Sequence, residues 1–215
     1  MPEDALLNDV NPHLINFYRW AAMGLDLGGI RAENDSDVYY SNRDRFNGLI
    51  RTGKADSRES AQLFYYLNRT GYNGLCRFNQ SGEFNVPFGR YKSIPYADRF
   101  DEYRGTFKRW EFRYGDFEAL QTQATDFIYA DPPYDVEFRQ YSKDGFQWQD
   151  QVRLAQWLAN HPGPVVLSNQ ATQRIVELYV RLGFQLRYLM GPRRISNNGD
   201  RTPAREVLAT KGVSG

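Results

Sequence analysis

The chain has 215 residues, of which 41% are hydrophobic and 25% charged, values ordinary for a globular protein able to bury a sizeable core. It contains no apolar run near the roughly 18 residues that a membrane span requires, and no signal-peptide hydrophobic segment at its N-terminus. One cysteine, Cys76, and two histidines leave neither an internal disulfide nor a structural zinc site to propose, so we expect a cytoplasmic protein with no membrane or metal partner.

The first predicted strand ends in a carboxylate. Residues 5–7 are apolar and lead into Asn8-Asp9, so Asp9 can accept hydrogen bonds from ribose hydroxyls at the carboxyl end of a strand. Asp9 can equally cap a helix, because Pro12 and an apolar helical periodicity over residues 14–18 come next. The residues by themselves leave both interpretations open.

Residues 31–57 are polar and charged, and we interpret them as an insertion on the open side of a sheet, anchored by Tyr39, Tyr40 and Phe46. The following segment, 58–67, places its apolar side chains on one helical face. That pattern indicates simple core packing.

Residues 69–92 form a basic block rich in glycine and aromatic residues. The pairs that flank Gln80-Ser81-Gly82 predict a hairpin. Arginines interleaved with aromatic rings on a protruding hairpin suit entry into a DNA groove, where arginine pairs with guanine and a ring wedges between bases. The alternative is a structural hairpin whose rings pack internally, which we favour for Phe78, Phe84 and Phe88.

The net charge of +1 conceals an uneven distribution. Residues 69–92 carry four basic side chains against one acidic, and residues 187–211 carry six against two. Residues 111–137 instead carry seven acidic side chains against one basic. Two basic segments around an acidic one suit a phosphate track beside a pocket for a cationic cofactor, and ordinary solvated faces are the alternative.

The stretch 127–134 reads Phe-Ile-Tyr-Ala-Asp-Pro-Pro-Tyr. Its first four residues predict a fully buried strand, and the two prolines force the chain out of the sheet at the strand's carboxyl end, where open α/β sheets bind ligands. The Asp131 carboxylate and a peptide carbonyl of the motif can each accept one hydrogen of an exocyclic amino group, which makes that nitrogen pyramidal and nucleophilic. Tyr134 offers a flat face for a flipped base. The alternative is a buried strand that ends in a proline turn.

Helices and strands alternate in the rest of the chain, which predicts an α/β fold with a parallel-rich sheet. The predicted elements are a helix at 149–160 stopped by Pro162-Gly163-Pro164, a strand at 165–169, a helix at 174–181, and strands at 184–188 and 206–209. Residues 135–146 are predicted to be a loop placed to close over a bound base, and residues 193–199 a polar loop.

Several of these stretches resemble the Dam-type (D12 class) DNA adenine-N6 methyltransferases, along nearly the whole chain. They are Leu-Leu-Asn-Asp-Val-Asn at 6–11, Tyr-Leu-Asn-Arg-Thr-Gly-Tyr-Asn-Gly-Leu-Cys-Arg-Phe-Asn at 66–79, Gly-Glu-Phe-Asn-Val-Pro-Phe-Gly-Arg-Tyr-Lys at 82–92, the Asp-Pro-Pro-Tyr box, and Arg-Ile-Ser-Asn-Asn-Gly at 194–199. The resemblance implies a Rossmann-like, S-adenosylmethionine-dependent methyltransferase domain at 1–30 and 111–215. It also implies a helical and β-hairpin insertion at 31–110 that recognises double-stranded DNA, usually at GATC.

The resemblance assigns the chemistry to a few residues. The catalytic motif would be Asp131, Pro132, Pro133 and Tyr134. The S-adenosylmethionine cofactor would contact Asp9 at its ribose, Asp116 and Phe117 at its adenine, and Asp131. From spacing alone, Tyr114 to Phe117 is only a turn.

The resemblance also assigns the DNA contacts. Arg77 would read a guanine, and Tyr72 would intercalate and fill the space that the flipped adenine leaves. The other base edges would be met by Asn73, Leu75, Pro87 and Tyr91, the phosphates by Arg69, Arg90 and Lys92, and the DNA backbone by a loop with Ser196 and Asn198.

One family feature has no counterpart in the printed sequence. The family carries, ahead of the segment at 6–11, a strand that runs into a Phe-x-Gly-x-Gly turn holding the methionine part of the cofactor. Residues 24–29 are glycine-rich but follow a predicted helix, so they are no substitute. A sheet lacking this central strand would keep unpaired edges, and we therefore expect either a truncation or a complementing N-terminal fragment supplied by another chain.

Two other functions remain open from the sequence. The missing glycine turn favours a non-catalytic DNA-binding remnant, or a subunit that needs the cofactor-binding segment in trans. A methyltransferase for RNA or for a protein amide nitrogen is a further possibility, against which the block at 69–92 argues.

Overall fold

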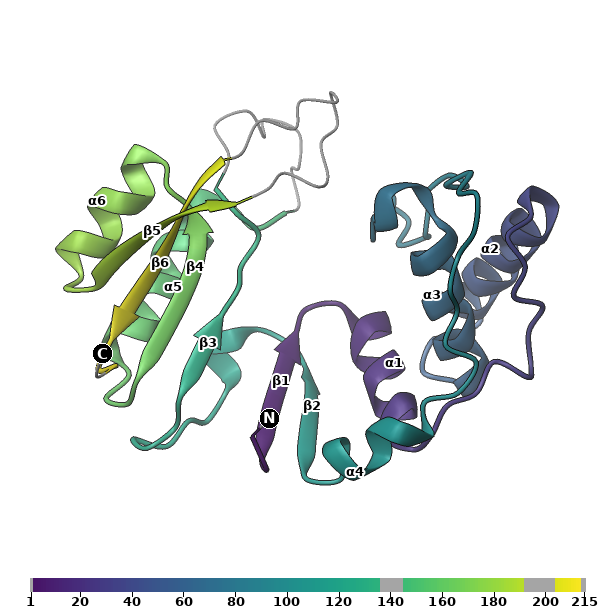
Figure 1. Ribbon diagram of the computed structural model, residues 1–215, viewed down its shortest axis with the longest axis horizontal. Helices are drawn as coiled ribbons and strands as arrows, with labels where there is room; N and C mark the ends of the chain where they lie inside the picture. Colours follow the sequence, from purple (N-terminus) through teal and green to yellow (C-terminus); the bar gives the residue numbers. More distant parts are fainter. Residues whose placement is uncertain (1, 136–144, 192–203, 214–215) are drawn as a thin grey trace. The chain divides into compact units, whose positions relative to one another are not determined.

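The computed structural model describes residues 2–135, 145–191 and 204–213. The chain divides into two compact units, Met1–Phe117 and Glu118–Gly215 (Figure 1). Both units contain helices and strands, so the fold is mixed α/β. Among the helices in these ranges, none combines the length and apolar character needed to cross a membrane.

The first unit is a set of helices beside a two-stranded sheet. Its elements are β1 (Ala5–Asp9), α1 (Pro12–Ala22), α2 (Ser36–Arg51), α3 (Arg58–Thr70), the single turns Tyr72–Gly74 and Asp101–Tyr103, α4 (Arg104–Phe107) and β2 (Trp110–Tyr114). β1 and β2 are parallel, with Leu7 opposite Phe112. Their carboxyl ends therefore lie at the same edge (Figure 1).

Helix α1 begins at a side-chain cap supplied by Asn11. The Asn11 carboxamide oxygen accepts from the backbone N–H groups of His13 (3.0 Å) and Leu14 (3.3 Å), and Pro12 occupies the first helical position, where no N–H is needed. The interpretation of Asp9 as the cap is therefore wrong. Asp9 instead ends β1, as the strand prediction required, and its Oδ1 accepts from the Asn11 N–H at 2.7 Å.

The core of the first unit joins α2 and α3 to the predicted hairpin that follows them, in which Phe78 and Phe84 form an antiparallel bridge. Tyr39 and Phe46 are fully buried in this core, so two of the three predicted anchors are confirmed. Tyr40 is 37% exposed, and the Arg43 guanidinium lies over its ring, because neighbouring positions on a helix point to different faces. Phe84 is buried, and Phe78 and Phe88 pack against the same core, which confirms internal packing for these rings.

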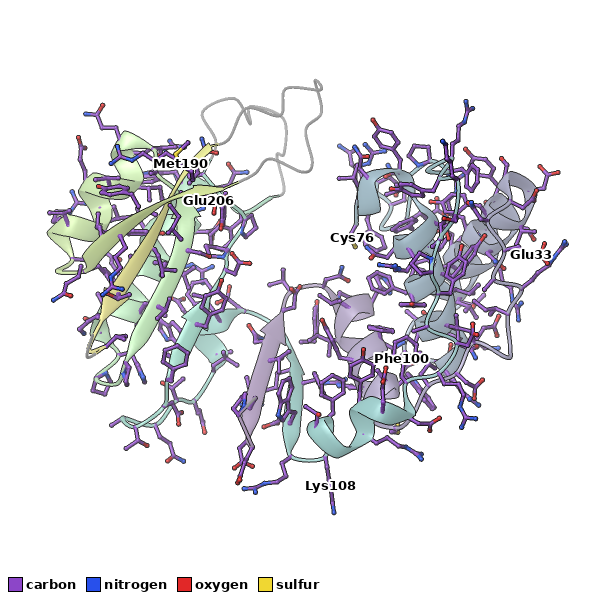
Figure 2. The ribbon with its side chains drawn as sticks, in the orientation of Figure 1. Glu33, Cys76, Phe100, Lys108, Met190 and Glu206 are labelled. Carbon is purple, nitrogen blue, oxygen red and sulfur yellow. The ribbon has the colours of Figure 1, made fainter. Side chains whose placement is uncertain are left out.

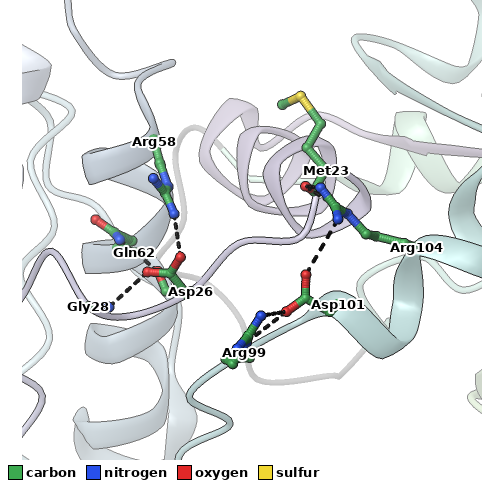
Figure 3. Close-up of polar contacts among 8 residues, drawn as sticks. All are labelled: Met23, Asp26, Gly28, Arg58, Gln62, Arg99, Asp101 and Arg104. Carbon is green, nitrogen blue, oxygen red and sulfur yellow. Dashed lines mark hydrogen bonds and ion pairs between the residues drawn. The ribbon is translucent and has the colours of Figure 1, made fainter.

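The glycine-rich segment after α1 is fastened to α3 by side chains (Figure 3). The Asp26 carboxylate accepts from the Gly28 N–H at 3.0 Å and pairs with Arg58 at 2.5 Å, while Gln62 donates to the Asp26 carbonyl at 2.6 Å. Arg104 closes the end of α1 by donating to the Met23 carbonyl at 3.0 Å. These contacts give the segment a structural role in shaping the first unit.

His13 is buried against aromatic rings on the inner face of α1. Its ring lies 4.9 Å from that of Phe78 and 5.1 Å from that of Phe46, and the side chain is 7% exposed. Nδ1 is buried without a hydrogen-bond partner among the described residues. This burial lowers the pKa of His13 below its ordinary value of 6.5, because the protonated ring would lose its hydration.

Acidification is expected to destabilise the protein through His13. The unfolded chain binds a proton as the pH falls below 6.5, whereas the folded chain still excludes it. The stabilising effect is therefore complete above pH 6.5 and is lost as the pH falls towards the folded-state pKa. Urea unfolding from about pH 7.5 to about pH 5 measures this loss, and His13→Phe should reduce it. An undiminished loss in that variant would contradict the assignment.

The second unit is built on a four-stranded sheet. Its elements are β3 (Ile128–Ala130), α5 (Trp148–Asn160), β4 (Val165–Gln170), α6 (Gln173–Arg181), β5 (Gln185–Gly191) and β6 (Ala204–Lys211), after a single turn at Phe117–Ala119. The order is β3-β4-β6-β5. Met190 on β5 and Glu206 on β6, labelled in Figure 2, lie on neighbouring strands.

The predicted helices and strands of this unit are present, but the sheet is less parallel than expected. β3 and β4 are parallel, whereas β6 runs antiparallel to both β4 and β5. The alternation of helix and strand stops after α6, and strands that follow one another directly are commonly antiparallel. The parallel-rich prediction is therefore wrong for this half of the sheet.

The strand before the Asp-Pro-Pro-Tyr box is also less buried than predicted. Phe127 is 60% exposed and Tyr129 is 58% exposed, while Ile128 and Ala130 are partly buried. Phe127 and Tyr129 lie two residues apart and share one face, which is open to solvent, and within the described ranges β3 also pairs only with β4. The prediction of a fully buried strand is wrong for this reason.

Candidate functional site

The Asp-Pro-Pro-Tyr turn begins where β3 ends. Ala130, the last residue of β3, pairs with Leu167 of β4, and Asp131 follows at the carboxyl edge of the sheet. Asp131 is exposed, Tyr134 is half-buried and Pro132 is buried. The acid and the ring can therefore be reached from solvent, while the first proline anchors the turn in the unit.

Ser168 on β4 fixes the orientation of Asp131. Its hydroxyl donates to Asp131 Oδ1 at 2.5 Å, a short bond typical of a charged acceptor. Burial raises the pKa of the Tyr134 hydroxyl above its usual value, so the hydroxyl stays protonated at neutral pH. The turn thus presents a carboxylate with one oxygen held by the protein and a neutral aromatic ring.

Asp135, directly after the turn, is a buried anchor that sequence reasoning missed. Its carboxylate accepts from Thr172 Oγ1 at 2.9 Å and from Arg174 Nε at 2.6 Å, with a second contact to Arg174 Nη2. The side chain is 7% exposed. A bidentate arginine partner on α6 offsets the cost of burying this charge. The spacing of an acid and a helix arginine far along the chain offers no local signal for this contact.

The carboxyl edge of β1 and β2 gathers the three other residues assigned to the cofactor. Asp9 lies opposite Tyr114 in the parallel register, and the Gly115 N–H donates to the Asp9 carbonyl at 3.1 Å. Asp116 and Phe117 follow directly, the first exposed and the second half-buried. Asn8 ties the two strand ends together by donating to the Arg113 carbonyl at 3.2 Å and the Gly115 carbonyl at 3.1 Å. Two carboxylates and a ring therefore share one edge of the first unit.

The hairpin within residues 69–92 holds Arg77 in a defined orientation. Arg77 Nε donates to Asn85 Oδ1 at 2.8 Å, and Nη2 donates to the Asn85 carbonyl at 3.2 Å. The side chain is exposed. Since a guanidinium has five N–H donors, three remain beyond these two bonds. The arrangement leaves one edge of the guanidinium able to meet a planar acceptor pair.

Three of the residues assigned to base contacts converge at the start of this block. The Tyr72 N–H donates to the Pro87 carbonyl at 2.8 Å, and the Tyr91 hydroxyl donates to the Gly71 carbonyl at 3.2 Å. Tyr72 is 47% exposed, which leaves its ring free of the core. Asn73 adopts a left-handed φ of 54°, and Leu75 packs on the core of the first unit.

The end of α3 and the segment around Gly89 approach each other so closely that position 89 requires a residue without a side chain. A Cβ added at Gly89 would lie 2.4 Å from the Tyr91 ring and 2.7 Å from the Thr70 carbonyl oxygen. The residue types of the block are therefore partly explained by close packing between the end of α3 and the segment around Gly89.

The cations assigned to phosphates are exposed, as such contacts require. Arg69 also donates to the Pro95 carbonyl at 3.0 Å, while Arg90 adopts a left-handed φ of 54°. Lys92 is exposed near the end of the block. Ser196 and Asn198 lie outside the described residues.

The fold and the site together define a class of protein. A mixed α/β chain with Asp-Pro-Pro-Tyr at a strand's carboxyl end is consistent with a methyltransferase fold. A family model for the D12 class N6 adenine-specific DNA methyltransferases matches residues 1–190. The chain belongs to this family.

Named relatives agree with the family assignment. The chain is 35% identical to the retron Ec67 DNA adenine methylase of Escherichia coli, over 97% of this chain and 76% of that protein. It is 36% identical to the DNA adenine methylase of Escherichia coli strain K12, over 95% of this chain and 78% of that protein. With the DNA N-6-adenine-methyltransferase of Escherichia phage P1 it shares 35% identity over 96% of this chain, which spans 29% of that longer protein.

Proposed function

We propose that this chain transfers a methyl group from S-adenosylmethionine to N6 of an adenine flipped out of double-stranded DNA, with GATC as its target. The observation that carries the proposal is the turn at 131–134. It is solvent-accessible, it sits at a strand's carboxyl edge, and Ser168 holds its carboxylate. The family assignment supports an adenine amino group as the acceptor of the methyl group.

The turn acts by making the lone pair of the adenine N6 available for attack. The free oxygen of Asp131 and a peptide carbonyl of the turn each accept one N6 hydrogen, which frees the nitrogen lone pair from the purine ring. Tyr134 stacks on the extruded base and limits its rotation. Catalysis is then mainly a matter of positioning for in-line attack, in which the N6–carbon bond would form as the carbon–sulfur bond of the donor breaks. Asp131 acts as an acceptor rather than an obligatory base, and the surplus N6 proton passes to solvent after transfer.

The carboxyl edge of β1 and β2 suits the cofactor. Asp9 can accept from ribose hydroxyls, Asp116 from an adenine amino group, and the half-buried Phe117 ring can pack on a purine face. When bound, S-adenosylmethionine supplies an electrophilic methyl carbon on a positively charged sulfur. Asp9 and Asp116 at this edge suit that positive charge.

Target recognition is assigned to residues 31–110, and cofactor binding and transfer to residues 1–30 and 111–215. The core shared by α2, α3 and the hairpin, on which α1 also packs, supports a common role for the recognition elements. Within it, Tyr72 would fill the gap left by the flipped adenine, and Arg77 would read a guanine. Arg69, Arg90 and Lys92 would contact phosphates, as would the loop with Ser196 and Asn198.

A second candidate is a DNA-binding subunit that gains its full cofactor site in trans. Within the described ranges β1 pairs only with β2 and β3 only with β4, so each has an edge that can accept a further strand. Leu6 on β1 is 38% exposed and Tyr129 on β3 is 58% exposed. A further strand at either edge would pair the backbone N–H and C=O groups that are open there.

Incorporation of isotope-labelled methyl groups tests the proposal. The purified protein is expected to label a duplex containing GATC, and neither a duplex whose target adenine already carries N6-methyl nor an RNA of the same sequence. Calorimetric titration with S-adenosylmethionine separates the two candidates. No cofactor binding at about millimolar concentration, together with retained DNA binding, would favour the subunit that needs a segment in trans.

A further inference from the structure

Asn169, at the carboxyl end of β4, is a buried amide with every hydrogen-bonding position in use. Its Oδ1 accepts from the N–H groups of Asp135 and Gln170, both at 2.9 Å. Its Nδ2 donates to Gln151 Oε1 at 3.0 Å and to the Tyr179 hydroxyl at 3.1 Å. An amide has two lone pairs and two hydrogens to offer, so this side chain has a single satisfied orientation.

Gln151 on α5 connects the Asn169 side chain to the turn by hydrogen bonds. Its side chain is 3% exposed. Because its Oε1 faces the Asn169 amide nitrogen, its Nε2 must point the other way, and it donates to the Pro133 carbonyl at 2.7 Å. The donor and the acceptor of each hydrogen bond in this series are therefore set by the two backbone N–H groups that donate to Asn169.

These two amides bind the peptide groups on either side of Tyr134. The Pro133 carbonyl belongs to the peptide before Tyr134, and the Asp135 N–H belongs to the peptide after it. Two fixed peptide planes define both backbone angles of the residue between them. The prolines end the strand ladder because they have no N–H. Side chains, rather than a neighbouring strand, therefore bond the Pro133 carbonyl and the Asp135 N–H.

We propose that Gln151 and Asn169 are positioning residues for methyl transfer. They set the direction in which Tyr134 and the carbonyls of the turn meet the target base, without touching that base themselves. This inference rests on the proposed function of the turn. The Asp135 carboxylate, held by Thr172 and Arg174, anchors the far end of the same segment.

Gln151→Glu distinguishes positioning from a simple structural role. The introduced carboxyl keeps an acceptor for Asn169, but as a carboxylate it places a second oxygen against the Pro133 carbonyl. Once protonated it regains a donor, and burial with one oxygen against the Pro133 carbonyl favours the protonated form. The variant should therefore misplace the turn at high pH and restore it at low pH.

The first readout is the single-turnover rate of methyl transfer. At about pH 8 the Gln151→Glu rate is expected to be about tenfold below wild type, equivalent to about 1.4 kcal/mol. At about pH 6 it should lie within about twofold of wild type, with KM for DNA unchanged at both pH values. Gln151→Met, which removes both hydrogen bonds without adding charge, should lose activity equally at both pH values.

The second readout is backbone hydrogen exchange, which needs no catalysis. A peptide that spans 131–135 reports only on the amides of Tyr134 and Asp135, because Asp131 becomes its amino terminus and prolines carry no amide hydrogen. Relative to wild type at the same pH, Gln151→Glu should exchange faster in this peptide at high pH and normally at low pH. Peptides from β4 and α6 should not change.

The matched control is Gln156→Glu, the same substitution at an exposed position of α5. It should behave as wild type in both readouts. An active wild type with a Gln151→Glu rate that is normal or independent of pH would overturn the positioning role. A wild type that transfers no methyl group would instead defeat the proposed function, and unchanged exchange at 131–135 in Gln151→Glu would then overturn the inference on its own.

Discussion

Asp131→Ala is expected to lower the rate of methyl transfer by about 10²–10³-fold, the loss typical of removing one preorganised electrostatic contact to a transition state. Duplex DNA binding should stay close to that of the wild type. The carboxylate accepts one N6 hydrogen at the moment when positive charge develops on that nitrogen, and alanine offers no acceptor there. Ser168 would lose its acceptor as well, but it remains able to bond the Ala130 carbonyl.

The measurement is single-turnover incorporation of labelled methyl groups, run beside a titration of a fluorescent duplex. Asp126→Ala is the matched control because Asp126 is an exposed acid of the same unit, before β3, whose carboxylate caps a loop N–H at 2.7 Å. It removes the same charge and should leave the rate unchanged. Full activity in Asp131→Ala would end the assignment of the turn as the catalytic motif.

The elements that the sequence predicts best are those marked by their own side chains. The helix at 148–160 and the strand at 165–170 were predicted within a residue or so, because apolar spacing and a Pro-Gly-Pro stop mark them. The turn at 131–134 was found for a similar reason, since two prolines after an apolar run can only leave a sheet. Each of these signals is local, so a single sequence contains it.

The burial of β3 and the amides behind the turn have no such local signal. Whether Tyr129 is covered depends on what packs on that face of β3, a property of the assembled fold. Gln151 and Asn169 look like ordinary polar residues of a helix and a strand, 18 positions apart, until the fold brings them together. The sequence leaves the cap of α1 undecided, because both Asp9 and Asn11 are good capping residue types. Asn11 is the cap because β1 extends as far as Asp9.

Arg77→Ala is expected to relax discrimination at one base pair of the target. Asn85 holds one edge of the guanidinium, so the remaining donors present a planar fork suited to guanine O6 and N7. Losing one such pair costs about 1–3 kcal/mol, or about 5- to 150-fold in discrimination at that position. Methylation of a panel of duplexes, each with one substituted base pair in GATC, measures the effect directly.

Lys92→Ala is the matched control, because Lys92 is an exposed cation of the same block that is expected to meet a phosphate. Its loss should weaken binding to every duplex of the panel equally and lower the salt dependence by about one phosphate contact. Arg77→Ala should leave the salt dependence of binding nearly unchanged. It should reduce the ratio of methylation rates between GATC and the duplexes substituted at the one base pair that Arg77 reads. If Arg77→Ala instead lowers binding uniformly and reduces the salt slope as Lys92→Ala does, Arg77 contacts the DNA backbone, and the guanine must be read by another side chain.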